Sequence, residues 1–378
     1  MRLLKTMWRV FSKKTALAAA LLALVLAILI LPGLFQTAGL VANLGAAARQ
    51  SVDTTGVIET EIHLRSGSAE RTARIYQTDT RGPKTAILFI PGLTPNGILN
   101  PRFVAVARSL AKSGYVVITP RLTGFDHFRL DPVAVEEIGF WYGQMRERPW
   151  FELRKAGIIG VSVGGTLALL AAARQPECRN LDFIVSIGGY RDLWRCQQRW
   201  FSNTRGVDSH GSYPVQYYGK WILMLTALDA MRNRQDHDRL EQALTDLVVT
   251  AKTSLTPSSL SAEGGLWYNL ALGQQNENRA LLAQISDQLQ ERLQSLSPGE
   301  ELSAITCPVF LVHGAYDELI PADETLELES LLTSTQPVTL LTPAISHTHP
   351  LLDKMSFWSR SKALAEGAFF LYRFVRAS

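Results

Sequence analysis

The chain has few cysteines and few charged residues, and it has no tract of low complexity apart from an apolar run near its start. Its 378 residues include 3 cysteines and 19% charged residues, with a formal net charge of +4. Cys178, Cys196 and Cys307 match no zinc spacing, so neither a metal site nor another cofactor is predicted. Cys178 and Cys196 can pair in an oxidising compartment, although no feature of the sequence requires it. The modest charge, without a basic patch in the body of the chain, excludes nucleic acid as an expected partner.

Acidic residues are also missing from the start of the chain. Residues 15–31, which are almost entirely Ala, Leu, Val and Ile, follow the basic residues Arg2, Lys5, Arg9, Lys13 and Lys14. This apolar run can extend to about Phe35, near the roughly 20 residues that cross a bilayer. The basic head predicts a cytoplasmic N-terminus and an extracytoplasmic remainder, as for a single-pass protein of a bacterial inner membrane. A signal peptide cleaved at Ala46-Ala47-Ala48 is the alternative.

Short apolar runs alternate with helical periodicity beyond residue 57. We expect helices over residues 103–112, 132–148 and 165–174. Residues 36–56 are small and polar and are predicted as a linker. The alternation predicts a mostly parallel sheet with helices on both faces. The expected strands are 57–64, 71–77, 85–90, 115–119, 155–159, 181–187, 307–314 and 338–341.

One short segment, Gly160-Val161-Ser162-Val163-Gly164, lies between a predicted strand and a predicted helix. A serine at such a turn adopts a strained backbone that lifts its Oγ above the sheet. We expect the two flanking glycines to be necessary, because a Cβ at either position would collide with the turn. The amide groups at the start of the following helix face a developing oxyanion.

Two further polar residues each follow a later predicted strand. Asp317 lies beyond the strand that ends at His313, and His347 lies beyond the last predicted strand. The order Ser162, Asp317, His347 resembles that of α/β-hydrolase-fold serine hydrolases, over roughly residues 57–376. The resemblance implies an α/β-hydrolase fold in which these are nucleophile, acid and base. His349 is the alternative base.

The same resemblance implies an oxyanion hole formed by the backbone N–H groups of Val163 and Leu93. Leu93 follows Pro91-Gly92 at the end of a strand. The family usually has His-Gly at this turn, so Pro91 is a departure. The chain also has no His-Gly-Gly-Gly run of the hormone-sensitive-lipase type. We expect His313 to be structural, and neither Glu318 nor Asp323 to act as the acid.

A long insertion interrupts the predicted core. Residues 191–304 have helical periodicity and many aromatic residues, and are predicted as a cap between the core segments 57–190 and 305–378. The aromatic residues either fill the interior of the cap or line an apolar pocket that faces Ser162.

These features predict a membrane-anchored hydrolase that cleaves an ester- or thioester-type acyl substrate, of small and apolar character, through an acyl-enzyme. The alternatives are a non-catalytic binding or scaffold protein that keeps the fold at the membrane, and a peptidase or acyltransferase that uses the same three residues.

Overall fold

The computed structural model describes residues 32–47, 55–67, 69–148, 150–202, 216–272, 279–347 and 351–378. Its centre is an eight-stranded sheet in the order β1-β2-β4-β3-β5-β6-β7-β8. β1 pairs with β2, and β2 with β4, in antiparallel fashion, and the remaining neighbours are parallel. The strands are β1 (Val57–Ser66), β2 (Ala69–Thr78), β3 (Lys84–Ile90), β4 (Val116–Pro120), β5 (Leu153–Val161), β6 (Phe183–Ile187), β7 (Val309–Gly314) and β8 (Val338–Thr342).

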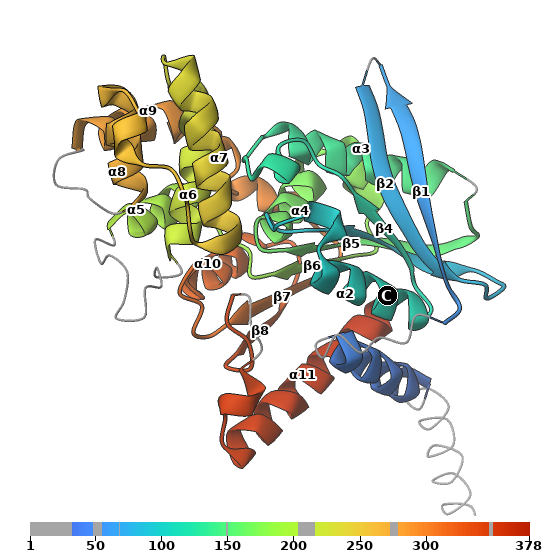
Figure 1. Cartoon of the computed structure of the whole chain (residues 1–378). Coiled ribbons are helices and arrows are strands. Elements are labelled where there is room, and N and C mark those ends of the chain that lie inside the picture. Colours follow the sequence, from blue (N-terminus) through green and yellow to red (C-terminus); the bar gives the residue numbers. More distant parts are fainter. Residues whose placement is uncertain are drawn as a thin grey trace, which may run out of the picture.

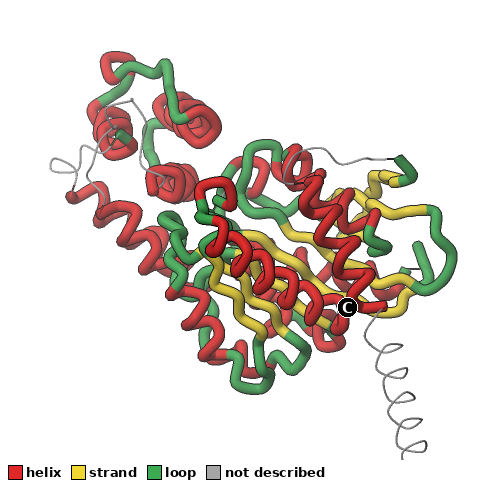
Figure 2. The backbone as a smooth tube through the Cα atoms, turned by 90° about the horizontal axis from the view of Figure 1, so that it is seen from below, coloured by secondary structure: helices red, strands yellow, loops and turns green. Residues whose placement is uncertain are grey.

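All eight predicted strands are present, and helices cover both faces of the sheet (Figures 1 and 2). One face packs against α3 (Val133–Glu147), α4 (Val163–Arg174) and α10 (Asp323–Leu331). The other face packs against α2 (Pro101–Lys112) and α11 (Phe357–Ala377). The mostly parallel α/β-hydrolase-like architecture predicted from the sequence is therefore confirmed.

The insertion forms a group of helices beside the sheet, drawn in green, yellow and orange in Figure 1. They are α5 (Leu193–Ser202), α6 (Gln216–Ala227), α7 (Arg234–Thr250), α8 (Ala262–Ala271) and α9 (Arg279–Ser295). Several aromatic residues of the insertion, namely Trp200, Phe201, Tyr217, Trp221 and Trp267, are buried in the cluster that also holds α3 and α4. Their burial favours the interpretation that they fill an interior.

The predicted linker, residues 36–56, is partly wrong. Residues 32–47 form a helix, and Leu40 belongs to the same buried cluster as Phe370 and Phe374 of α11. Hydrogen bonds also join this helix to α2: the Ser109 Oγ donates to the carbonyl of Asn43, 2.9 Å away. The linker prediction rested on the small and polar residues of this segment, whereas Leu40 packs against apolar residues in the last helix of the chain.

Among the helices that the structure describes, none has the length and apolarity to span a bilayer. The predicted anchor segment, residues 15–31, lies outside the described residues.

The three cysteines are free thiols. Cys178 lines a cavity together with Cys307, and Cys196 lies on α5. Burial raises the pKa of Cys178 and of Cys307 to about 12, so both thiols stay protonated near neutral pH.

Candidate active site

Ser162 occupies the tight turn between β5 and α4. Its backbone has φ 56° and ψ −126°, a region that costs a serine about 1–3 kcal/mol. A Cβ on Gly160 would lie 2.1 Å from the Gly164 carbonyl oxygen, and one on Gly164 would lie 2.3 Å from the Pro91 oxygen. The predicted need for both glycines is confirmed, because backbone atoms close in on each side of the serine.

The structure brings the three predicted residues together at the carboxyl ends of their strands. The Ser162 Oγ lies 3.0 Å from the His347 Nε2, and the His347 Nδ1 lies 2.7 Å from the Asp317 Oδ2. A carboxylate can only accept a hydrogen bond, so Nδ1 carries the hydrogen and Nε2 is free to accept from the serine hydroxyl. His349, the alternative base, lies outside the described residues.

Asp317 is held in its charged form. Burial alone would raise its pKa, but hydrogen bonds from His313 and His347 outweigh burial and hold the pKa of Asp317 well below its usual range. The backbone N–H groups of Leu319 and Ile320 also donate to the Asp317 Oδ1, each at 2.9 Å. The carboxylate is therefore fixed in place with its charge directed at His347.

His313 is fully buried behind Asp317, as expected of a structural histidine. Its Nε2 lies 2.9 Å from the carbonyl of Ile320 and its Nδ1 lies 2.6 Å from the Thr325 Oγ1. Because the carbonyl can only accept, Nε2 carries the hydrogen, and the same nitrogen lies 3.4 Å from the Asp317 Oδ2. Glu318 and Asp323 are exposed.

The turn after β3 approaches Ser162 closely. A Cβ on Gly92 would lie 3.1 Å from the Ser162 Cβ, so Leu93 follows directly beside the serine. Val163 is the first residue of α4, and its backbone N–H therefore has no acceptor within the helix. Both predicted oxyanion donors thus belong to segments that meet at Ser162.

Three side chains of the insertion donate hydrogen bonds to carbonyls of the active-site loops. The Trp200 Nε1 donates to Leu319 at 2.7 Å, and the Gln216 Nε2 donates to Glu318 at 3.1 Å. The Tyr218 hydroxyl donates to the carbonyl of Leu93. Burial raises the pKa of Tyr218, so the hydroxyl keeps its proton. Sequence reasoning missed these contacts, and the aromatic richness of the insertion was the only signal.

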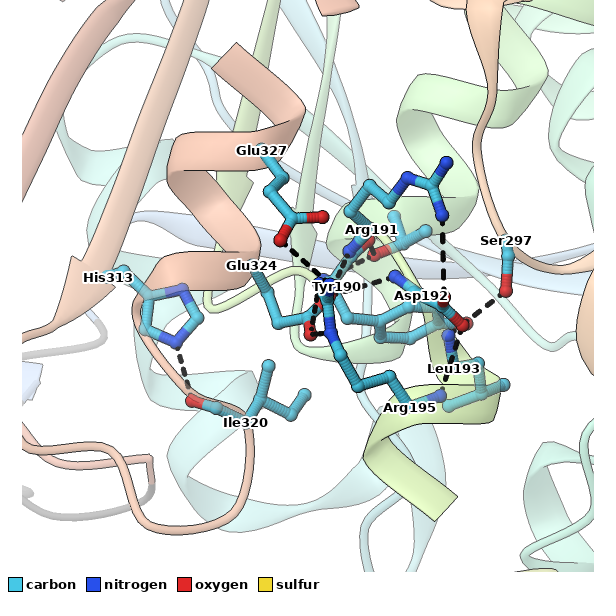
Figure 3. Close-up of polar contacts among 11 residues, drawn as sticks. Tyr190, Arg191, Asp192, Leu193, Arg195, Ser297, His313, Ile320, Glu324 and Glu327 are labelled. Carbon is cyan, nitrogen blue, oxygen red and sulfur yellow. Dashed lines mark hydrogen bonds and ion pairs between the residues drawn. The ribbon is translucent and has the colours of Figure 1, made fainter. Parts of the chain in front are cut away.

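A buried carboxylate joins α10 to the start of the insertion (Figure 3). Glu324 accepts from the backbone N–H groups of Arg191 at 3.0 Å and Asp192 at 2.8 Å, and from the Arg195 Nε at 2.7 Å. Arg195 also lies 2.8 Å from Glu327. Since α10 follows the Asp317 loop directly, this contact fixes the entry to the insertion relative to Asp317.

One group of possible metal ligands lies on α7, within the part of the chain that the structure describes. His237, Asp238 and Glu241 have ligand atoms within 4.8 Å of one another. The Arg129 guanidinium lies 2.8 Å from Glu241 and also pairs with Asp229. The charge of Arg129 opposes a cation at this position.

Comparison with known proteins adds a family. The model of the X-Pro dipeptidyl-peptidase (S15) family matches residues 139–348, a range that includes Ser162, Asp317 and His347. A comparison with curated protein sequences found no match.

Several solved structures are similar to this chain. Brefeldin A esterase, described as a bacterial homologue of human hormone sensitive lipase, is 14% identical with a TM-score of 0.51, over 91% of this chain and 86% of that one. An esterase from Pseudomonas putida is 14% identical with a TM-score of 0.47, over 87% and 86%. The acylaminoacyl peptidase of Pyrococcus horikoshii is 12% identical with a TM-score of 0.48; the match covers 84% of this chain but 41% of the peptidase. At 14% identity and a TM-score of 0.51, the likeness to brefeldin A esterase concerns the fold alone.

Proposed function

The chain belongs to the X-Pro dipeptidyl-peptidase (S15) family of α/β-hydrolase enzymes, and from this premise we propose that it is a serine hydrolase with Ser162 as nucleophile. The observation that carries the proposal is the unbroken chain of short contacts, 3.0 Å from Ser162 to His347 and 2.7 Å from His347 to Asp317.

In the proposed reaction, the Ser162 Oγ attacks the substrate carbonyl while the His347 Nε2 takes its proton. The backbone N–H groups of Leu93 and Val163 stabilise the oxyanion, and Asp317 stabilises the imidazolium. His347 then donates the proton to the leaving group as the carbonyl–leaving-group bond breaks. Water, deprotonated by His347, attacks the acyl-enzyme; the bond between the acyl carbon and the Ser162 Oγ then breaks, and His347 returns the proton to that oxygen.

We assign an ester- or thioester-type acyl substrate of apolar character as the first candidate. The hydrogen bond from Tyr218 to the carbonyl of Leu93 supports it, because it places one aromatic side chain of the insertion beside the turn after β3. A peptidase is the second candidate, because the family match is to X-Pro dipeptidyl-peptidases. Hydrolysis of p-nitrophenyl esters of graded chain length, compared with an X-Pro p-nitroanilide, separates the two. An esterase should prefer the ester series by orders of magnitude, and the reverse preference would establish the peptidase.

A fluorophosphonate probe tests the nucleophile. Wild type should be labelled, and Ser162→Ala should not, with turnover lowered by about three to six orders of magnitude. Ser330→Ala, an exposed serine on α10, is the matched control and should be labelled like wild type. Equal labelling of Ser162→Ala and wild type would sink the assignment.

We further propose that residues 15–31 anchor the enzyme, with the N-terminus cytoplasmic and the hydrolase extracytoplasmic. Packing of the helix at residues 32–47 against α11 supports an uncleaved segment, since cleavage at Ala46-Ala47-Ala48 would separate that helix from the enzyme. Sequencing the N-terminus of membrane-extracted protein tests this. A mature protein that begins after Ala48 would establish the signal peptide instead.

A further inference from the structure

The last helix, α11, is apolar on two sides. Ala363, Phe370 and Phe374 are buried against the sheet. On the outward side Trp358 is 80% exposed and Phe369 is 63% exposed. Trp358, Ala365, Phe369 and Tyr372 follow one another at intervals of seven, four and three residues, which places them along one stripe of a helix. A surface helix of a protein surrounded by water does not usually carry such a second stripe.

The helix at residues 32–47 packs against the C-terminal end of this stripe and carries exposed apolar residues of its own. It lies beside the C-terminal part of α11 (blue and red in Figure 1), and a Cβ on Gly33 would lie 3.2 Å from the ring of Tyr372. Phe35 is 74% exposed. We call the combined set the α11 surface; its exposed members are Leu34, Phe35, Phe357, Trp358, Leu364 and Phe369.

The chain next to this surface indicates what covers it. The apolar run of residues 15–31 ends where the helix at 32–47 begins, so anything that embeds the run brings the α11 surface to the same place. Charge points the same way, because α11 carries Arg360, Lys362, Arg373 and Arg376 against one acidic residue, Glu366. Basic side chains attract anionic lipid headgroups, and Trp and Phe favour the boundary between headgroups and acyl chains.

We propose that the α11 surface rests on an anionic lipid bilayer. α11 begins shortly after the loop that carries His347, so this contact brings that side of the active site close to the membrane. The surface does not include Ser162, Asp317 or His347, and the proposal does not depend on the hydrolase activity.

The test uses the full chain in vesicles of phosphatidylcholine and phosphatidylglycerol. Phe369→Cys is labelled with the environment-sensitive fluorophore NBD, with wild type treated with the same reagent as blank for Cys178, Cys196 and Cys307. Val249→Cys, on an exposed position of α7 in the insertion, is the matched control. A doxyl quencher on the lipid chains should reduce emission at position 369 by about half and leave position 249 unchanged, as for an interfacial helix.

Three results would overturn the proposal. The first is equal quenching of both labels by aqueous iodide, with none by doxyl lipid. The second is protection of the label at position 369 from iodide that rises with protein concentration, because a second copy of the chain would then cover this surface. The third is protection of this label from iodide that persists in lipid-free detergent and depends on residues 1–31, because that segment would then cover the surface. Turnover of a p-nitrophenyl ester by Phe369→Cys, expected to equal wild type, keeps failure here distinct from failure of the hydrolase assignment.

Discussion

At the residue scale, the site depends on backbone atoms packed more closely than side chains would permit. The positive φ of Ser162, 56°, is held by β5, by α4 and by the turn after β3. Its backbone N–H donates to the carbonyl of Ile187 at 2.6 Å, which ties the turn to the neighbouring strand β6. Strain of about 1–3 kcal/mol persists at such a position only because the surrounding structure fixes it.

The close approach predicts the effect of a methyl group at Gly164. Gly164→Ala must displace the Pro91 carbonyl, so we expect a loss of about 1–3 kcal/mol in the free energy of unfolding and slower labelling by fluorophosphonate. Gly265→Ala, in α8 with open space around it, should instead stabilise the protein by about 0.5–1 kcal/mol. Urea denaturation measures both. A Gly164→Ala variant as stable and as reactive as wild type would contradict the described turn.

The charge of Asp317 predicts an acid dependence of stability. Because the pKa of Asp317 is lower in the folded protein than in the unfolded chain, its stabilisation is fully present above the unfolded pKa of about 3.9. It is lost as pH falls further through the folded pKa, by a total on the order of 3 kcal/mol. Urea unfolding at pH 7 and pH 3 should show a smaller pH-dependent loss in Asp317→Asn than in wild type.

Asp323→Asn, an exposed aspartate on α10, is the control and should keep the acid dependence of wild type. Asp317→Asn should also lower kcat by about four orders of magnitude, because an amide no longer holds His347 in the required tautomer. A pH-dependent loss that is equal in wild type and Asp317→Asn would show that other carboxylates dominate.

At the element scale, the side chain of Tyr218 couples α6 to the turn after β3. The Tyr218 hydroxyl donates to the carbonyl of Leu93, whose N–H is the proposed oxyanion donor. We therefore assign Tyr218 as a positioning residue. Tyr218→Phe should lower kcat by about tenfold with little change in KM, because the donor is needed mainly in the transition state.

A matched control separates positioning from stability. The Tyr268 hydroxyl donates to the carbonyl of Leu255 at 2.9 Å, a contact that lies within the insertion. Both Tyr218→Phe and Tyr268→Phe should lower the free energy of unfolding by about 0.5–1.5 kcal/mol, but Tyr268→Phe should leave kcat unchanged. Equal kcat in the two variants would show that the hydroxyl of Tyr218 is structural only.

At the scale of the whole molecule, local patterns predict the sheet well. The parallel strands are short apolar runs bounded by turn residues, most of them buried, and the order of Ser162, Asp317 and His347 follows from the order of the strands. The hydrogen bonds from Trp200 and Tyr218 were not predictable, since their acceptors are backbone carbonyls in segments far away along the chain. Periodicity indicates a helical insertion but not which side chains turn toward the core.

The prediction that residues 36–56 form a linker is partly wrong for the same physical reason, because the partners of Leu40 lie far away along the chain. The helix at residues 32–47 supports a final prediction. Leu40 is 1% exposed and shares its cluster with the last helix, so it joins the two ends of the described chain. Leu40→Ala should lower the free energy of unfolding by about 2–5 kcal/mol. The neighbouring Val41 is exposed, and Val41→Ala should change stability by about 0.5 kcal/mol or less. Urea denaturation of both variants in detergent distinguishes a docked helix from a linker. If both variants lose equally little free energy of unfolding, residues 32–47 serve only as a linker. The α11 surface would then lack the contact that connects it to residues 15–31.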